Sequence, residues 1–183
     1  GAGGDSNHGG IEFCLDNGIM NGTSADTFSP DSPITRAQFA TMFYRLAGEP
    51  EAPTASAFTD IKAEWYRKAV NWAAANGVIN GTSATTFSPD SYVTREQIAA
   101  IFYRYAQSKG IDVSDVSTGL DSYNDYAEIS DYAKTPVAWC FNENVMFIHS
   151  VNGYEYAIYP KVAPSRADTA TMFWKFSYVL NEG

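Results

Sequence analysis

Three arginines hold the same place in three similar segments, the first turn of an expected helix. The segments read ITRAQFATMFYRLA, VTREQIAAIFYRYA and PSRADTATMFWKF, and a Thr or Ser directly precedes each arginine, Arg36, Arg95 and Arg166. In the first two segments, Thr followed three residues later by Gln predicts a capping box, so the arginine takes the first helical position. A cation is unfavourable there, because the helix dipole already places positive charge at this end.

Such an arginine can serve as part of an anion site. Its planar guanidinium matches a carboxylate, and the free amides of a helix N-terminus favour negative charge. A structural role stays open, in which each arginine pairs with an acid or a loop carbonyl of an adjacent segment. The recurrence at an unfavourable position favours ligand binding. Two later arginines of the same helices, Arg45 and Arg104, are interpreted as structural or solvent-exposed.

An internal repeat supplies the elements that position these arginines. Residues 18–47 align without a gap on residues 77–106. Ahead of the second copy, residues 58–77 predict a helix that ends at Asn76-Gly77. One of its faces is formed by Ile61, Trp65, Ala69, Trp72 and Ala73. A loop rich in Asn, Gly, Ser, Thr and Pro follows, and the next helix buries residues at i, i+3, i+4 and i+7, namely Ile98, Ile101, Phe102 and Tyr105. Each unit is therefore a helix, a loop and a helix.

The first and third copies depart from this pattern. Residues 1–10, GAGGDSNHGG, resemble a leader or an artificial linker, so repeat 1 (11–47) is expected to lack its front half. Repeat 2 spans 57–107 and repeat 3 spans 121–181, with linkers at 48–57 and 108–122. In repeat 3, Asn152-Gly153 lies between β-prone runs and predicts a small hairpin near 147–151 and 154–158.

Composition restricts the possible partners. The chain has 183 residues and a net charge of −9, which argues against a general nucleic-acid or anionic-membrane surface. No apolar run approaches the roughly 20 residues that cross a bilayer, so membrane insertion is not expected. Cys14 and Cys140 both align with Ala73 and are expected to be buried free thiols. Their spacing does not suit zinc, and the acidic pattern of a calcium loop is missing, so neither a metal nor a cofactor is expected.

Few residues suggest catalysis. Asp60 and Asp125 stand just before the front helices, where Asp is ordinarily an N-cap, and we expect them to shape a groove. His8 and His149 have no identifiable catalytic partner. No carboxylate pair, nucleophile elbow or phosphate loop is singled out, so an enzyme is not expected.

Four motifs, FTDIKAEWYRKAV, GVINGT, TFSPDSYVTREQIA and FYR, resemble in this order the S-layer homology (SLH) domain of bacterial surface proteins. The resemblance implies a mainly α fold, in which three SLH repeats form a pseudo-threefold trimer around a central bundle of the second helices. It also implies an extracellular protein at the bacterial cell surface, anchored noncovalently to the cell wall. The implied partner is secondary cell wall polysaccharide, often pyruvylated, bound in grooves between repeats.

The resemblance also implies the ligand-binding residues, which are the three arginines, Asp60, Asp125, Trp65, Gly22, Thr23, Gly81 and Thr82. Repeat 3 departs from it, with Asp131 or Tyr132 at the place of Trp65 and no Gly-Thr pair. A pyruvate ketal carries a carboxylate for arginine, while Trp65 offers a flat apolar face to a sugar ring. The alternative is a structural module that assembles with other surface-layer proteins.

Overall fold

The protein was analysed as a computed structural model, which describes residues 5–21, 29–150 and 156–183. These residues form a mainly α fold, as expected. The α-helices are α1 (Asp5–Asp16), α2 (Arg36–Leu46), α3 (Glu64–Ala75), α4 (Arg95–Ser108), α5 (Lys134–Asn142) and α6 (Arg166–Glu182). Three short 3-10 helices, η1 (Leu120–Ser122), η2 (Tyr126–Glu128) and η3 (Asp131–Ala133), precede α5. Strands β1 (His149–Ser150) and β2 (Tyr156–Ala157) form the sheet.

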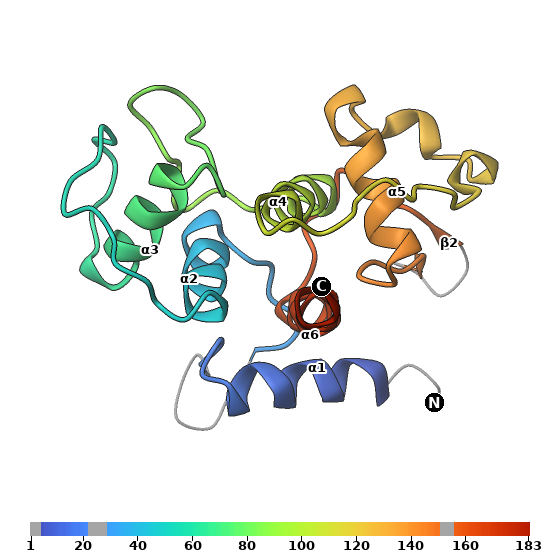
Figure 1. The fold of residues 1–183 in the computed structure, drawn as a ribbon, viewed down its shortest axis with the longest axis horizontal. Coiled ribbons are helices and arrows are strands. Elements are labelled where there is room, and N and C mark those ends of the chain that lie inside the picture. Colours follow the sequence, from blue (N-terminus) through green and yellow to red (C-terminus); the bar gives the residue numbers. More distant parts are fainter. Residues whose placement is uncertain (1–4, 22–28, 151–155) are drawn as a thin grey trace.

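Three helices, α2, α4 and α6, lie at the centre, and three others surround them (Figure 1). Each outer helix packs on the inner helix of the preceding unit: α3 on α2, and α5 on α4. The outer helix α1 packs on α6, near the other end of the chain. This contact closes the three units into a ring.

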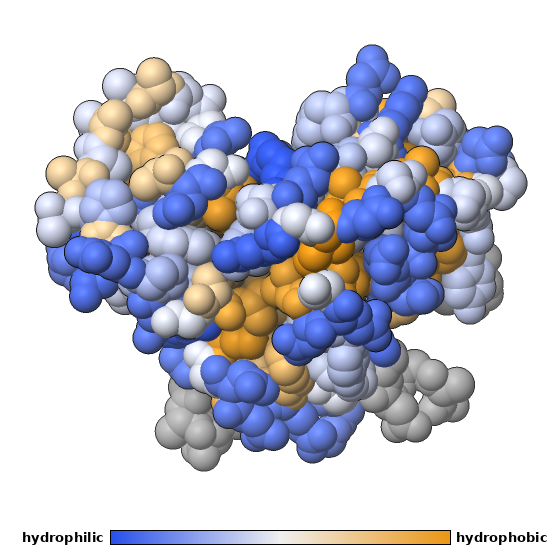
Figure 2. All heavy atoms as spheres, viewed as in Figure 1, coloured by the Kyte–Doolittle hydropathy of each residue, from blue (hydrophilic) through white to orange (hydrophobic). Residues whose placement is uncertain are grey.

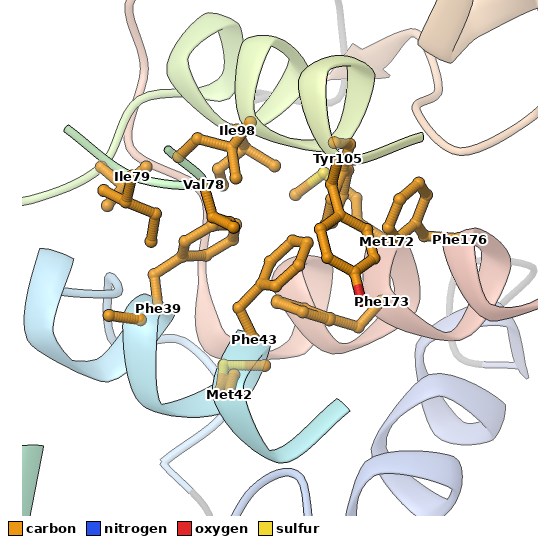
Figure 3. Packing of buried hydrophobic residues seen from close by; sticks show 14 of the residues in the cluster. Phe39, Met42, Phe43, Val78, Ile79, Ile98, Tyr105, Met172, Phe173 and Phe176 are labelled. Carbon is orange, nitrogen blue, oxygen red and sulfur yellow. The ribbon is translucent and has the colours of Figure 1, made fainter. Parts of the chain in front are cut away.

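Aromatic rings fill the centre of the bundle. Phe43, Phe102 and Phe173 hold equivalent positions in the three inner helices, and all three are fully buried. Their ring centroids lie 5.9 Å (Phe43 to Phe102), 5.7 Å (Phe43 to Phe173) and 5.3 Å (Phe102 to Phe173) apart. Figure 3 shows Phe43 of α2 and Phe173 of α6 lying side by side in this cluster. Burial of these large apolar rings and the contacts between them stabilise the bundle. The hydrophobic core therefore lies along the pseudo-threefold axis.

The inner helices begin where the sequence predicts. Both capping boxes are formed, by Thr35 with Gln38 before α2 and by Thr94 with Gln97 before α4. At α6, the Ser165 hydroxyl accepts a hydrogen bond from the Asp168 amide. Each arginine is therefore the first residue of its helix.

The expectation of a leader at residues 1–10 is wrong for residues 5–10, which are part of α1. Glycines weaken a helix in isolation, but here they allow a close approach to α6. A Cβ at Gly10 would lie 2.5 Å from the Thr171 Cα, and one at Gly9 would lie 2.8 Å from the Trp174 ring. Packing against α6 therefore outweighs the low helix propensity of this segment.

The two cysteines are buried and free, as predicted. They hold equivalent places in outer helices: the Cys14 thiol donates to the Ala170 carbonyl at 3.6 Å, and the Cys140 thiol donates to that of Ala99 at 3.8 Å. Burial raises the pKa of the Cys14 thiol to about 12. Burial also raises the pKa of Cys140. Both thiols are therefore neutral at physiological pH.

The front helix α3 is shorter than predicted, and one residue of its expected shared face is exposed. Trp65 is 59% exposed, whereas Ala69, Trp72 and Ala73 are buried. Helix α3 begins only at Glu64, and Tyr66 and Val70 turn inward with Ala69 and Ala73. Trp65 lies beside this face and contacts the ring of Tyr66 edge-on at 4.9 Å.

The predicted hairpin is confirmed within the described residues, but its strands are shorter. Strands β1 and β2 are antiparallel and pair His149 with Ala157 and Ser150 with Tyr156. The predicted Asn152-Gly153 turn lies outside the described residues.

The segment after α4 is part of the packed structure. Ile111 and Val113 pack against the core together with Phe141 of α5 and Leu180 of α6. On the face shown in Figure 2, hydrophobic atoms gather over the junction of α4, α5 and α6. The region expected as a linker at 108–122 therefore covers one end of the bundle.

Candidate functional site

The three arginines bind loop carbonyls of the next unit. The Nε and Nη2 groups of Arg36 donate to the carbonyls of Phe87 (2.8 Å) and Asn80 (2.7 Å). The same groups of Arg95 donate to Ile158 (3.0 Å) and Phe147 (2.6 Å). Arg166 Nη2 donates to the Asn21 carbonyl at 2.7 Å. All three are buried, and desolvation lowers the pKa of each guanidinium.

The amides at the starts of these helices are also engaged. The Arg36 and Ala37 amides donate to the carbonyls of Ser91 and Pro89, at 2.8 and 3.0 Å. The Arg95 and Arg166 amides donate in the same way to Val162 and Ser32. The expectation that these helix starts offer free amides to an anion is therefore wrong. Loop backbone takes the place of the anion, since its carbonyls carry the partial negative charge that the dipole favours.

Asp60 and Asp125 bind the backbone amides of the loops whose carbonyls Arg36 and Arg95 bind. Asp60 accepts from the amides of Phe87 (2.9 Å) and Ser88 (2.8 Å), and Asp125 accepts from Ile158 (3.1 Å) and Tyr159 (2.7 Å). The expectation of N-caps is wrong, because Ala63 caps α3 without a side-chain bond and Asp125 makes no cap bond to η2. Partial desolvation acts to raise the pKa of Asp60, but these amides lower it overall. Phe87 thus bonds Asp60 through its amide and Arg36 through its carbonyl.

The loop of the second unit needs its glycine. A Cβ at Gly81 would lie 2.4 Å from the Phe58 ring and 2.6 Å from the Ser83 carbonyl oxygen. Thr82 bonds within the loop: its amide donates to the Thr86 carbonyl at 2.9 Å, and its hydroxyl lies 2.6 Å from that of Ser88. Gly22 and Thr23, their predicted counterparts, lie outside the described residues.

Two grooves at equivalent positions lie between neighbouring units. Groove A has a volume of about 400 Å³ and is lined by Ile19, Met20, Asn21, Gln38, Thr41, Met42, Arg45, Trp65 and Arg166. Groove B has a volume of about 270 Å³ and is lined by Arg36, Ile79, Asn80, Gly81, Gln97, Ala100, Ile101, Arg104 and Tyr132. Within the described part of the chain, each lining contains two arginines, one large aromatic ring and no acid.

The second arginine of each groove, Arg45 or Arg104, is one that the sequence predicts to be structural or solvent-exposed. Arg45 Nη1 donates to the Ile19 carbonyl at 3.3 Å, and Arg104 Nη2 donates to the equivalent Val78 carbonyl at 3.0 Å. Both side chains are more accessible than the buried arginines, since Arg45 is half-buried and Arg104 is exposed. The recurrence of FYR in the two well-matched repeats was the signal that could have identified them.

The aromatic ring in each groove comes from the next outer helix or the turn before it. Trp65 and Tyr132 are each 59% exposed. Of the two residues proposed to replace Trp65 in repeat 3, Tyr132 lines the groove.

Arg95 lies elsewhere. It lines a hollow of about 420 Å³ near the starts of the inner helices, with Tyr92, Asp168, Asp31, Pro33 and residues 162–165. Of the predicted site residues, the structure therefore brings Trp65 and Arg166 together in groove A, and Arg36 and Gly81 in groove B.

No helix within the described ranges is long and apolar enough to cross a membrane. Across the same ranges, no group of three or more His, Cys, Asp or Glu residues is arranged to hold a metal ion.

Comparison with known proteins places these features in a family. Residues 3–40 and 57–99 match the S-layer homology domain. An endoglucanase of Bacillus sp. (strain KSM-635) is 32% identical over 86% of this chain and 16% of its own length. The surface-layer 125 kDa protein of Lysinibacillus sphaericus is 29% identical over 89% of this chain and 13% of its own. A cellulosome-anchoring protein of Acetivibrio thermocellus is 29% identical over 64% of this chain and 29% of its own.

The chain thus spans less than a third of the length of these relatives. The first family match begins at residue 3 and includes the whole of α1, which agrees with the packing of that helix on α6. Residues 3–40 and 57–99 of this chain therefore belong to the S-layer homology domain family.

Proposed function

We propose that this chain is a non-enzymatic anchor that holds a larger protein at the bacterial cell surface by binding an acidic cell-wall polysaccharide. The family match and the surface-layer and anchoring relatives support the cellular role. The charge of the grooves supports the ligand class. In a chain with a net charge of −9, grooves A and B each present two arginines and no acid among their described lining residues.

The two arginines of each groove have different roles, one in loop support and one in ligand binding. Arg36 and Arg166 fix the loop that forms one wall, since their donors bind its carbonyls. Arg45 and Arg104 each donate one hydrogen bond to a carbonyl from one guanidinium nitrogen. Their charge would pair with a ligand carboxylate. A pyruvate ketal on a terminal sugar would supply that carboxylate.

The sugar ring would lie against the exposed face of Trp65 or Tyr132, where apolar ring carbons meet an aromatic surface. Gln38 in groove A and Gln97 in groove B would bond its hydroxyls. The predicted residues Asp60, Gly81 and Thr82 would serve groove B by shaping its loop, whereas Asp125 would hold the third loop, at Ile158 and Tyr159. Arg95 would support the third loop without touching a ligand in either groove.

The test is cosedimentation with purified wall polysaccharide, before and after removal of pyruvate by mild acid. Replacing one charged hydrogen-bonding partner costs about 1.5–3 kcal/mol, so R45Q/R104Q is expected to weaken binding by at least tenfold. R67Q is the control, because Arg67 pairs with Glu64 outside both grooves. Binding should also weaken at high salt. Indifference to pyruvate removal and to R45Q/R104Q would contradict the proposal.

A protein assembly module is the second candidate. Hydrophobic atoms gather over the junction of α4, α5 and α6, where they are open to contact with another protein (Figure 2). Light scattering distinguishes the two, since assembly requires oligomers without polysaccharide and the anchoring function does not.

A further inference from the structure

The ring of three units has a third position equivalent to grooves A and B, between α6 and α1. There, Asp168 and Thr171 stand where Gln38 and Thr41 line groove A. We infer that α1 occupies this third groove with the side chain of Asn7 and keeps it closed to ligand. If the third groove is closed, the chain has two ligand-binding sites, and this consequence rests on the proposed function.

The Asn7 amide bridges the two groove residues. Its Nδ2 donates to Asp168 Oδ1 at 3.1 Å, and its Oδ1 accepts from the Thr171 hydroxyl at 2.9 Å. An amide side chain has a donor group and an acceptor group, and each of them makes a bond here. Asn7 thus makes within the protein the kind of contacts that a sugar hydroxyl would make in groove A.

The close approach of α1 to α6 explains why Asn7 reaches them. A Cβ at Gly10 would lie 2.5 Å from the Thr171 Cα and 2.6 Å from its amide nitrogen, so not even an alanine fits. The equivalent outer-helix positions hold Ala69 in α3 and Pro136 in α5. Only the α1 interface therefore depends on a glycine at this position, and a helix without this Cβ can lie nearer to its partner.

Charge in the third position also differs. Asp168 replaces the Gln of grooves A and B, and its carboxylate would repel an anionic sugar. Lys175 replaces Arg45 and Arg104, and its ammonium lies 4.5 Å from the centre of the Trp174 ring. The third position therefore differs from grooves A and B in both the charge and the orientation of its polar groups.

Thiol labelling tests the closure without any ligand. Cys14 is buried between α1 and α6, while Cys140 is buried at the equivalent place in α5 and serves as the internal control. N7A is expected to speed alkylation of Cys14 by iodoacetamide about tenfold, the factor that corresponds to losing the bonds of one amide, and to leave Cys140 unchanged. T171V removes the other end of the bridge and should act in the same direction. Unchanged labelling of Cys14 in both variants would overturn the closure.

Calorimetry with a methyl hexopyranoside that carries a 4,6-linked pyruvate ketal tests the consequence. The wild-type chain should bind two molecules, R45Q/R104Q none, and N7A/D168Q a third. Three sites in the wild-type chain, or binding that survives R45Q/R104Q, would overturn the inference. No binding by the wild-type chain would instead contradict the proposed function, and the thiol labelling would still decide whether the groove is closed.

Discussion

At the scale of single residues, an aspartate and a buried arginine hold the same loop residue from its two backbone groups. Phe87 is held through its amide by Asp60 and through its carbonyl by Arg36, and Ile158 is held in the same way by Asp125 and Arg95. The buried arginine at each helix start therefore has a structural explanation. A guanidinium buried with two carbonyls stabilises the loop more than it disturbs the helix dipole, because the unbonded carbonyls would cost more.

R36A is expected to lower the free energy of unfolding by about 3 kcal/mol, since the carbonyls of Phe87 and Asn80 both lose a charged donor. Urea unfolding followed by circular dichroism measures this. R45Q is the matched control and should change the stability by less than about 1 kcal/mol, because Arg45 is partly exposed and makes one long bond. Equal losses in the two variants would contradict this division between loop support and ligand binding.

Asp60 makes the stability depend on pH. The folded pKa of its carboxyl lies below the ordinary value of 3.8, so its contribution is complete above that value and is lost as the pH falls through the folded pKa. The wild-type protein is therefore expected to exceed D60N in free energy of unfolding by a constant amount from pH 5 to pH 8, and this difference should shrink below pH 3.8. Chemical unfolding across this range would show it. A difference that grows on acidification would contradict the sign.

At the scale of elements, helix α1 shows where local patterns fail. The segment GAGGDSNHGG has low helix propensity and is expected to be a leader or linker, yet residues 5–10 belong to α1. Its stability comes from contacts with α6, which lies more than 150 residues away along the chain. By contrast, the starts of α2, α4 and α6 were predictable, since the capping boxes before α2 and α4 and the serine cap before α6 are each local to four residues.

G10A tests the packing of α1. In an exposed helix, replacing Gly by Ala stabilises by about 1 kcal/mol. At Gly10, the new Cβ would clash with the backbone of Thr171, so a loss of about 1–3 kcal/mol is expected instead. The sign of the change in the midpoint of thermal unfolding therefore decides the question, with D16A on the exposed side of α1 as the control. A stabilised G10A protein would contradict the close approach.

The partners of the site residues could not be predicted either. Arg36 and Arg95 bond carbonyls that lie 44 to 63 residues further along the chain, and Arg166 bonds one that lies 145 residues earlier. These contacts are set by the tertiary arrangement. The sequence predicts a role for Arg36, Arg95 and Arg166 but leaves a ligand, an acid of the adjacent repeat and a loop carbonyl as alternative partners. The sequence favours a structural or solvent-exposed role for Arg45 and Arg104, and their bonds to the carbonyls of Ile19 and Val78 agree with a structural one. Only the arrangement of the units brings them into grooves.

At the scale of the whole molecule, the three units depend on one another. Each outer helix packs on the inner helix of the preceding unit, and α1 closes the ring on α6 (Figure 1). The rings of Phe43, Phe102 and Phe173 meet at the centre. The repeats and the mainly α fold were predictable from the alignment, the periodicity and the family resemblance, but the closing contact by α1 was not.

F102A is expected to lower the free energy of unfolding by about 3–5 kcal/mol, because Phe102 is fully buried among rings from both other inner helices. Amide hydrogen exchange should speed up in α2, α4 and α6 together, since the three share one core. Y156A, at a ring that is 69% exposed, is the control and should change little. Faster exchange confined to α4 would show that the units are independent.

The central claim is that grooves A and B bind an acidic sugar through their accessible arginines. Titration calorimetry with wall polysaccharide, with and without its pyruvate, tests it most directly on the wild-type chain and on R45Q/R104Q. The account predicts binding that needs both the pyruvate and the two arginines, while R67Q binds as the wild type does. Equal binding of the polysaccharide without pyruvate, or undiminished binding by R45Q/R104Q, would contradict it.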